Sequence, residues 1–339
     1  MNLQPRLTKP ADFGFNRTTW MNRVFHLITT LLLCAYLAAC GTDTGSSGSG
    51  IGSGTSIGGG SGGSLSGDRP GLTLRLTDAP FDEAVSVMLT FVEVRMRKKG
   101  GGGWVSIDLS DSPQQIDLAA LQGIKSAPLL FDKDVPYDDY DELRLILDTT
   151  TPMANMITLS GGGTPELKIP SSASSGIKIK GDFTVSNTLP TLLVVDVDLR
   201  QSIKQSGPNY IMNPVVRLVK GDNFGHKRGI VDPTLLTAAS CSDALVDTYN
   251  SVYVYNGHNV TPDDINQKSK KNNDPLTTTR IVYDGATSSY LYEAAFLPAG
   301  DYTIAFTCNA NRDDLDKNDD LKFFNKQNVT VKLNNTTFF

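Results

Sequence analysis

Short stretches of alternating apolar and polar residues begin at residue 72. Leu72, Leu74 and Leu76 alternate with polar residues, which is the period of a half-buried β-strand. A second apolar face follows at Val85, Val87, Leu89 and Phe91, after which the phase slips to Val92, Val94 and Met96. A slip of one residue moves every side chain to the other face of a sheet and therefore predicts a bulge or a passage between layers.

The same pattern predicts further strands in two regions. In the first they cover 104–109 (the hairpin partner of the preceding strand), 129–135, 143–147, 156–159, 167–169, 177–180, 183–185, 191–199 and 215–219, with strand or helical turn at 116–121 and an acidic turn at 137–142. In the second they cover 251–255, 279–283, 289–296, 301–308 and 328–333, with a polar segment between 256 and 276. Many short strands with almost no helical period predict an all-β chain with two β-sandwich domains, of immunoglobulin-like type.

One strongly apolar run, Leu27 to Leu37, lies ahead of these strands. It is too short to span a bilayer, which takes about 20 apolar residues, and it ends in Leu37-Ala38-Ala39-Cys40, the pattern of a bacterial lipoprotein signal. The pattern predicts removal of residues 1–39, acylation of Cys40 by fatty acids such as palmitate, and a permanent lipid anchor. An ordinary secretory signal is the alternative. Met21 is the more natural start, and Gly41 in place of Asp favours the outer membrane of a Gram-negative cell.

Composition then divides the mature chain. Residues 40–71 are almost all Gly, Ser and Thr, which predicts a flexible tether. The two domains are expected at 72–220 and 229–339, joined by a linker at 221–228 rich in Gly, Asp and Asn.

Charge and cysteine content narrow the function classes. Residues 1–39 hold four of the 31 Lys and Arg and one of the 36 Asp and Glu, so the mature chain has a net charge of −8. This balance argues against nucleic acid as a partner. Cys241 and Cys308 are the cysteines left after Cys40; in an exported chain they are expected to form a disulfide, two separate buried thiols being the alternative.

Three ordered segments carry a resemblance to a known family. They are Leu74 to Pro80 (Leu-Arg-Leu-Thr-Asp-Ala-Pro), Lys168 to Ile179, and Val195 to Ile203 followed by Asn213 to Arg217. Region 72–219 thereby resembles a lipoprotein domain of unknown function of the 4382 type, to which no catalytic residues are assigned. Where that family has a Pro-Ala-Gly-x-Tyr turn, this chain has Val135 to Tyr140. The turn Leu297 to Tyr302 is similar to that of prealbumin-like and carboxypeptidase-regulatory-like modules, and the C-terminal region resembles the companion domain of some family members.

Two groups of acidic residues are candidates for chemistry. Asp314, Asp316 and Asn318 have the one-three-five spacing of a calcium loop, although Gly is missing at the sixth position; a solvated acidic turn is the alternative to a Ca²⁺ site. Asp196 and Asp198 share one face of a strand with Arg200, and Arg217 is expected to approach from the next strand. They predict a cation or acid–base site, or else a ladder of ion pairs on the solvent face.

Together these features predict a tethered, non-enzymatic envelope module that binds a glycan or a protein through loops at the ends of its sandwiches. The alternatives are a structural or accessory subunit of an envelope or surface assembly, and a hydrolase that uses the carboxylates of Asp196 and Asp198. No cofactor other than Ca²⁺ is expected.

Overall fold

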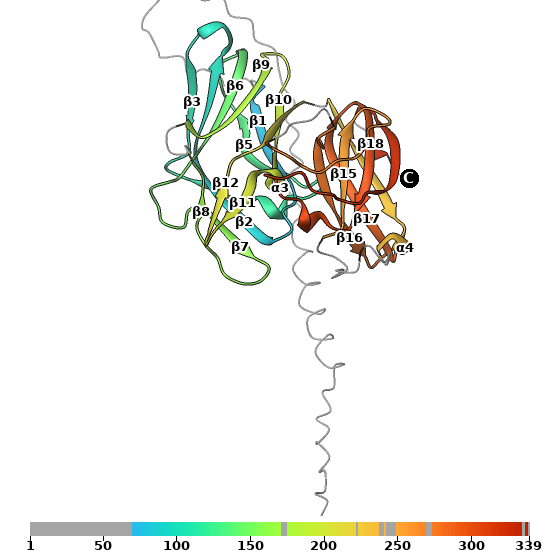
Figure 1. Ribbon diagram of the computed structural model, residues 1–339. Helices are drawn as coiled ribbons and strands as arrows, with labels where there is room; N and C mark the ends of the chain where they lie inside the picture. Colours follow the sequence, from blue (N-terminus) through green and yellow to red (C-terminus); the bar gives the residue numbers. More distant parts are fainter. Residues whose placement is uncertain are drawn as a thin grey trace, which may run out of the picture. The chain divides into compact units, whose positions relative to one another are not determined.

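The structure, a computed structural model, describes residues 70–170, 175–221, 223–236, 241, 249–268, 273–333 and 336–337. Strands make up both halves of this part of the chain, the first at 72–220 and the second at 224–337. The helical elements are single turns (Figure 1). They are η1 (Lys99–Gly101), η2 (Leu118–Ala120), α3 (Leu199–Ser202), α4 (Pro233–Leu236) and η4 (Ala310–Arg312). The predicted all-β class with several sheets is confirmed. The signal and tether, residues 1–39 and 40–71, lie outside the described residues apart from 70 and 71.

Three sheets form the first half. One has the order β13–β10–β1–β5, with β1 (Leu72–Ala79) parallel to β10 (Thr191–Asp198) and antiparallel to β5 (Ala127–Lys133); its outer strand is β13 (Val216–Lys220). The second sheet has the order β3–β2–β6–β9, and β4 and β7 also pair with β2. Its strands are β2 (Ala84–Lys98), β3 (Trp104–Asp108), β4 (Gln114–Asp117), β6 (Asp138–Leu147), β7 (Met156–Leu159) and β9 (Ile177–Val185). A small third sheet contains β8 (Leu167–Lys168), β11 (Ile203–Ser206) and β12 (Asn209–Met212).

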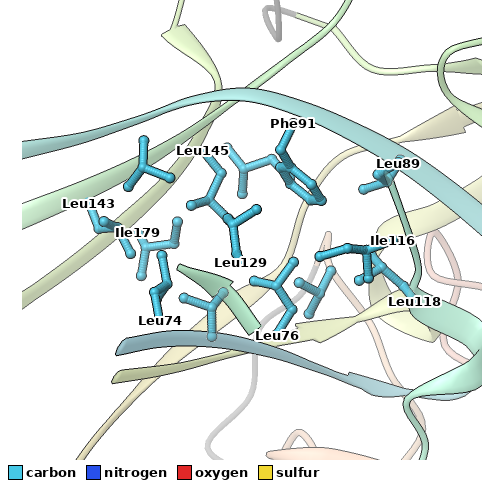
Figure 2. Close-up of a cluster of buried hydrophobic side chains, with 14 of the residues drawn as sticks. Leu74, Leu76, Leu89, Phe91, Ile116, Leu118, Leu129, Leu143, Leu145 and Ile179 are labelled. Carbon is cyan, nitrogen blue, oxygen red and sulfur yellow. The ribbon is translucent and has the colours of Figure 1, made fainter. Parts of the chain in front are cut away.

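The apolar faces of the first two sheets meet in one core. Leu74 and Leu76 of β1 and Leu129 of β5 lie opposite Phe91 of β2 and Leu145 of β6 (Figure 2). All five side chains are buried. The leucine alternation that predicted the first strand thus supplies one wall of this core.

The predicted phase slip lies in β2. Its pairing with β6 shifts register between Phe91 and Glu93, and the buried positions change from Leu89 and Phe91 to Val94 and Met96. The predicted bulge is confirmed. Val85, expected on the buried face, is instead 61% exposed.

A seven-stranded sheet forms the second half. Its order is β19–β18–β15–β16–β17–β14–β20, with β14 (Phe224–Val231), β15 (Ser251–Asn256), β16 (Thr277–Asp284), β17 (Ser289–Pro298), β18 (Gly300–Thr307), β19 (Phe324–Val331) and β20 (Thr336–Thr337). Its core includes the disulfide between Cys241 and Cys308. The predicted pairing of these cysteines is confirmed.

Several boundaries differ from the prediction. The expected linker at 221–228 is largely strand, because β14 pairs with β17 and β20 in the seven-stranded sheet of the second half. The expected acidic turn at 137–142 lies mostly within β6, where ion pairs such as Arg97 with Asp141 make the acidic residues compatible with a strand. The small strands β11 and β12 were missed because they lack an extended apolar alternation.

Two tyrosines make the same contact at the start of two strands. The hydroxyl of Tyr140 donates to the carbonyl of Pro136 at 2.7 Å, and the hydroxyl of Tyr302 donates to the carbonyl of Pro298 at 2.7 Å. Both side chains are buried. The turn of the first half, whose sequence departs from Pro-Ala-Gly-x-Tyr, therefore keeps the hydrogen bond found at the Pro-Ala-Gly-Asp-Tyr turn of the second.

Candidate functional site

The end of β10 carries the two carboxylates singled out in the sequence. Asp196 is 6% and Asp198 5% exposed, so the expected ladder on the solvent face is wrong. Asp196 forms an ion pair with Arg217 at 2.5 Å, as predicted, and Arg217 also donates to the carbonyl of Phe296 in β17 at 2.7 Å. The pair therefore joins the first half of the chain to the second.

Arg200 does not lie on the strand with these carboxylates. The Asp198 side chain accepts the backbone N–H of Gln201 at 2.9 Å, and this cap starts the single turn α3 that contains Arg200. The expected shared face of Asp196, Asp198 and Arg200 is therefore wrong, because the strand ends at Asp198.

The Arg200 guanidinium is buried, 6% exposed, among groups from both halves. It forms an ion pair with Asp82 at 2.5 Å and donates to the hydroxyls of Ser251 at 3.0 Å and Thr278 at 3.1 Å. A fourth hydrogen bond goes to the carbonyl of Ala310 at 3.1 Å. All the donor-bearing nitrogens of this guanidinium thus have partners, which is the condition under which a buried charge is tolerated.

Arg200 and its partners form a contact between the two halves that we call the junction, and Asp82 is the second charged residue in it. It lies between β1 and β2, is 4% exposed, and contacts Arg280 of β16 at 3.3 Å as well as Arg200. Burial tends to lower the pKa of Arg200, but the charge of Asp82, the interactions with Tyr253 and Asp313 and the hydrogen bond to Asp82 together outweigh burial and raise this pKa. Arg200 therefore stays charged throughout the physiological pH range.

A fourth buried carboxylate, that of Asp78, belongs to the same region. Asp78, from the Leu-Thr-Asp-Ala-Pro segment, accepts the N–H of Leu199 through Oδ1 at 3.3 Å, and its Oδ2 is buried without a hydrogen-bond partner among the described residues. Burial, together with the charges of Asp198 and Asp196, raises the pKa of Asp78 well above its ordinary value. Burial likewise raises the pKa of Asp198 to about 7, although the N–H of Gln201 opposes the rise.

A cleft of about 530 Å³ lies next to Arg200. Residues of both halves line it, and the side chains relevant to binding are Phe81, Glu83, Lys204, Gln205, Asn311 and Asp316. Cations, carboxylates and amides thus surround one aromatic ring. Such a lining suits a ligand with many hydroxyl or amide groups better than an apolar one.

The acidic loop after η4 forms one wall of this cleft. Asp314 pairs with Lys317, and Asp316 lies 3.4 Å from Lys204 and 3.7 Å from Lys268. The carboxylates of the predicted calcium loop therefore have lysine partners.

The fold brings Asp264 together with two other carboxylates of this acidic loop. Asp264, Asp313 and Asp319 each place one oxygen within 4.8 Å of the others. Burial raises the pKa of Asp264, and it raises the pKa of Asp313 to about 6. The sequence analysis missed this group because Asp264 lies in the polar segment 256–276, far along the chain from the acidic run.

Cys40, the predicted lipidation site, lies outside the described residues. Among the described residues there is no helix with the length and apolar character needed to cross a bilayer.

These features define an all-β chain whose two halves are joined by buried ion pairs beside a polar cleft. Residues 71–214 match the model of a family described as "Domain of unknown function (DUF4382)". The resemblance predicted for region 72–219 is confirmed. No curated protein sequence matches the chain.

Comparison with solved structures gives low similarity. The minor pilin GBS52 of Streptococcus agalactiae aligns at 11% identity and a TM-score of 0.18, over 79% of this chain and 93% of its own. The TIE protein of Bacillus anthracis aligns at 9% identity and a TM-score of 0.16, over 79% of this chain and 33% of its own. A fimbrial protein of Bacteroides ovatus aligns at 11% identity and a TM-score of 0.19, over 80% of this chain and 48% of its own. These scores are too low to indicate a shared arrangement of the whole chain.

Replacing Arg200 is expected to destabilise the protein strongly. Arg200→Met leaves Asp82 buried with Arg280 as its remaining ionic partner, and breaking a buried pair costs about 3–5 kcal/mol. The free energy of unfolding, measured by guanidinium denaturation, should fall by about that amount. Lys99→Met is the matched control, since its pair with Asp182 is solvent-exposed and its loss should change little. Equal stability of the two variants would contradict a structural role for Arg200.

Asp198 is expected to make the folded protein less stable as pH rises. Its carboxyl ionises near pH 4 in the unfolded chain but only at about 7 when folded, so the folded state holds the proton more tightly. The free energy of unfolding therefore falls between about pH 4 and 7, by roughly 4 kcal/mol at most, and the loss is complete above pH 7.

Thermal melts between about pH 5 and 8 test this, because Asp198→Asn should flatten the decline in melting temperature. Asp148→Asn is the control: hydrogen bonds from Thr151 and Thr150 lower the pKa of Asp148 to about 2, so its stabilising charge is lost only at acid pH. An unchanged slope in Asp198→Asn would refute the assignment.

Proposed function

We propose that this protein is a non-enzymatic module of the cell envelope that binds a glycan in the cleft beside Arg200. The observation that supports this most directly is the lining of the cleft, in which charged and amide side chains surround Phe81. Sugars present hydroxyls that pair with carboxylates, amides and ammonium groups, and an apolar ring face that packs on an aromatic side chain. A protein ligand is the other outcome that the binding test separates.

The carboxylates first considered for hydrolysis have structural partners. Asp196 pairs with Arg217, and Asp198 accepts two hydrogen bonds from Gln201, both at 2.9 Å. Both side chains are largely buried and border a second cleft of about 480 Å³, where Asp196 is paired with Arg217. This supports binding rather than catalysis as the role of this region.

The cleft has walls that are held in place. Arg200, which lines the cleft, forms an ion pair and hydrogen bonds with residues of both halves. Lys204 and Asp316, which also line the cleft, form an ion pair with each other. Preorganised walls reduce the entropy cost of binding, which suits recognition of a weakly held, hydrated ligand such as a sugar chain.

The predicted signal supports a location in the envelope. The sequence predicts a lipid on Cys40 as the anchor, and the Gly- and Ser-rich composition of residues 41–71 predicts a tether with a reach of about 30 Å. A tether of that reach lets the folded part contact glycans beyond the lipid head groups.

Binding is tested with the full chain against a panel of immobilised envelope glycans, including peptidoglycan fragments and lipopolysaccharide oligosaccharides. The wild-type protein should retain at least one glycan. Gln205→Ala combined with Asn311→Ala should weaken that binding about thirtyfold, because each side chain lines the cleft and contributes on the order of 1 kcal/mol.

Both substitutions are at exposed positions, so folding should be unaffected. Gln327→Ala, exposed on β19, is the control and should bind like the wild type. The glycan assignment would be refuted if the wild-type protein bound no glycan, or if the cleft variant bound as well as the wild type. Capture of a protein instead of a glycan would identify the ligand of the cleft as a protein.

The anchor is tested separately by fractionation. Cys40→Ala should move the protein from the membrane pellet to the soluble fraction, because the acyl chains supply the membrane affinity. Cys34→Ala, in the same apolar segment, should leave the protein in the membrane. Retention of Cys40→Ala in the membrane would contradict lipidation at this cysteine.

A further inference from the structure

Three carboxylates from two distant segments converge at one place, and one of them, Asp313, also lines the cleft. Asp264 lies 49 positions before Asp313 in the sequence, and Asp319 follows in the same loop as Asp313. One oxygen of each lies within 4.8 Å of the other two. Two oxygens bound to one Ca²⁺ are at most about 5 Å apart, since Ca–O distances are 2.3–2.6 Å. The spacing therefore fits a shared cation.

Asp264 gives an independent reason to expect a ligand. Its side chain is 1% exposed, and its Oδ1 is buried without a hydrogen-bond partner among the described residues. A buried carboxylate oxygen without a partner is costly, on the order of several kcal/mol in general terms for a charged group. A cation bound to that oxygen would remove this cost.

Backbone and hydroxyl donors hold the three carboxylates in place. The N–H of Asp319 donates to Asp264 Oδ2 at 2.5 Å, and the N–H of Asp314 donates to Asp319 Oδ2 at 2.6 Å. Asp313 accepts the hydroxyl of Tyr253 at 2.5 Å and the N–H of Ile265 at 3.1 Å. Each carboxylate is thus oriented through a contact that leaves lone pairs for a further ligand.

The nearby lysines do not neutralise this group directly. Lys317 pairs with Asp314, and Lys268 with Asp316, at the outer side of the loop. In the part of the chain that the structure describes, no ion pair includes Asp264 or Asp319. Arg200 and Lys317 act on Asp313 and Asp319 only through their charges, so a ligand that contacts the carboxylate oxygens of this cluster directly would still be stabilised.

We propose that Asp264, Asp313 and Asp319 form a binding site for a hard divalent cation, Ca²⁺. An all-oxygen donor set excludes a preference for the softer metals that favour Cys and His. The Ca²⁺ ion accepts irregular geometry and completes its six to eight ligands with carbonyls and water, whereas Mg²⁺ demands near-ideal octahedral geometry. The site goes beyond the proposed glycan binding and does not depend on it.

A bound ion would fasten the segment around Asp264 to the 313–319 loop. Asp314 and Asp316, which line the cleft, lie in this loop. The cation would thereby stabilise one wall of the cleft.

The test uses the full chain, freed of divalent cations with EDTA and then titrated with CaCl₂ in a calorimeter. Binding in the submillimolar to millimolar range is expected, as for extracellular calcium modules. At a free Ca²⁺ concentration 100-fold above the dissociation constant, the melting temperature should rise by about 5–10 °C. Mg²⁺ at the same concentration should raise it less. Tb³⁺, a luminescent substitute for Ca²⁺, should be sensitised by Tyr253.

Matched substitutions separate this site from the outer acidic residues. Asp264→Asn keeps the shape and the hydrogen bond from Asp319 but removes one charge, and should lower Ca²⁺ affinity at least tenfold. Its melting temperature in EDTA should equal or exceed that of the wild type, because the new amide can donate to the neighbouring carboxylates. Asp316→Asn makes the same charge change in the 313–319 loop, at a residue outside the cluster, and this variant should bind Ca²⁺ like the wild type.

Should Asp264→Asn fail to fold in EDTA, as judged by circular dichroism, Asp319→Asn replaces it with the same expectation. The proposal is overturned if the wild type shows no heat and no change in melting temperature at 10 mM Ca²⁺. It is equally overturned if the cluster variant binds as well as Asp316→Asn, or if Mg²⁺ stabilises as strongly as Ca²⁺.

Discussion

The buried ion pair between Arg200 and Asp82 is the interaction on which the arrangement of the two halves depends. Two charges removed from water are tolerated only when every donor finds an acceptor. Here the acceptors come from Ser251, Thr278 and the carbonyl of Ala310, all in the second half. The first half therefore cannot satisfy its own buried arginine, and the second half is needed to complete it.

The same junction leads to the acidic loop. The Arg200 guanidinium lies 6.0 Å from the centre of the Tyr253 ring, and the Tyr253 hydroxyl donates to Asp313. A single row of side chains thus runs from the β1–β2 connection through the junction to the three-carboxylate cluster. The cleft is open beside this row. Structural and binding roles are consequently close together, which explains why residues that looked catalytic in the sequence have structural partners.

Local patterns predicted what depends on nearest neighbours. The alternation of Leu72, Leu74 and Leu76 identified a strand and its buried face, and the phase slip after Phe91 located a bulge. The prediction of secondary structure failed where the conformation of a residue depends on a partner that is distant in the sequence. Acidic residues in 138–142 are strand because Arg97 and Lys98 of β2 pair with them. Asp198 ends its strand because it caps a helical turn.

The sequence by itself determined the strand periodicity, the all-β class, the cysteine pair and the family resemblance of the first region. Each of these is carried by residue type and short spacing, and the two cysteines had only each other as partners in the mature region after Cys40. The tertiary structure decided which charges are buried and which meet. Asp82 and Arg200 are 118 positions apart, and Asp264 reaches Asp319 from 55 positions away. No local pattern encodes such contacts, because the free energy of a charge depends on what surrounds it once the chain has folded.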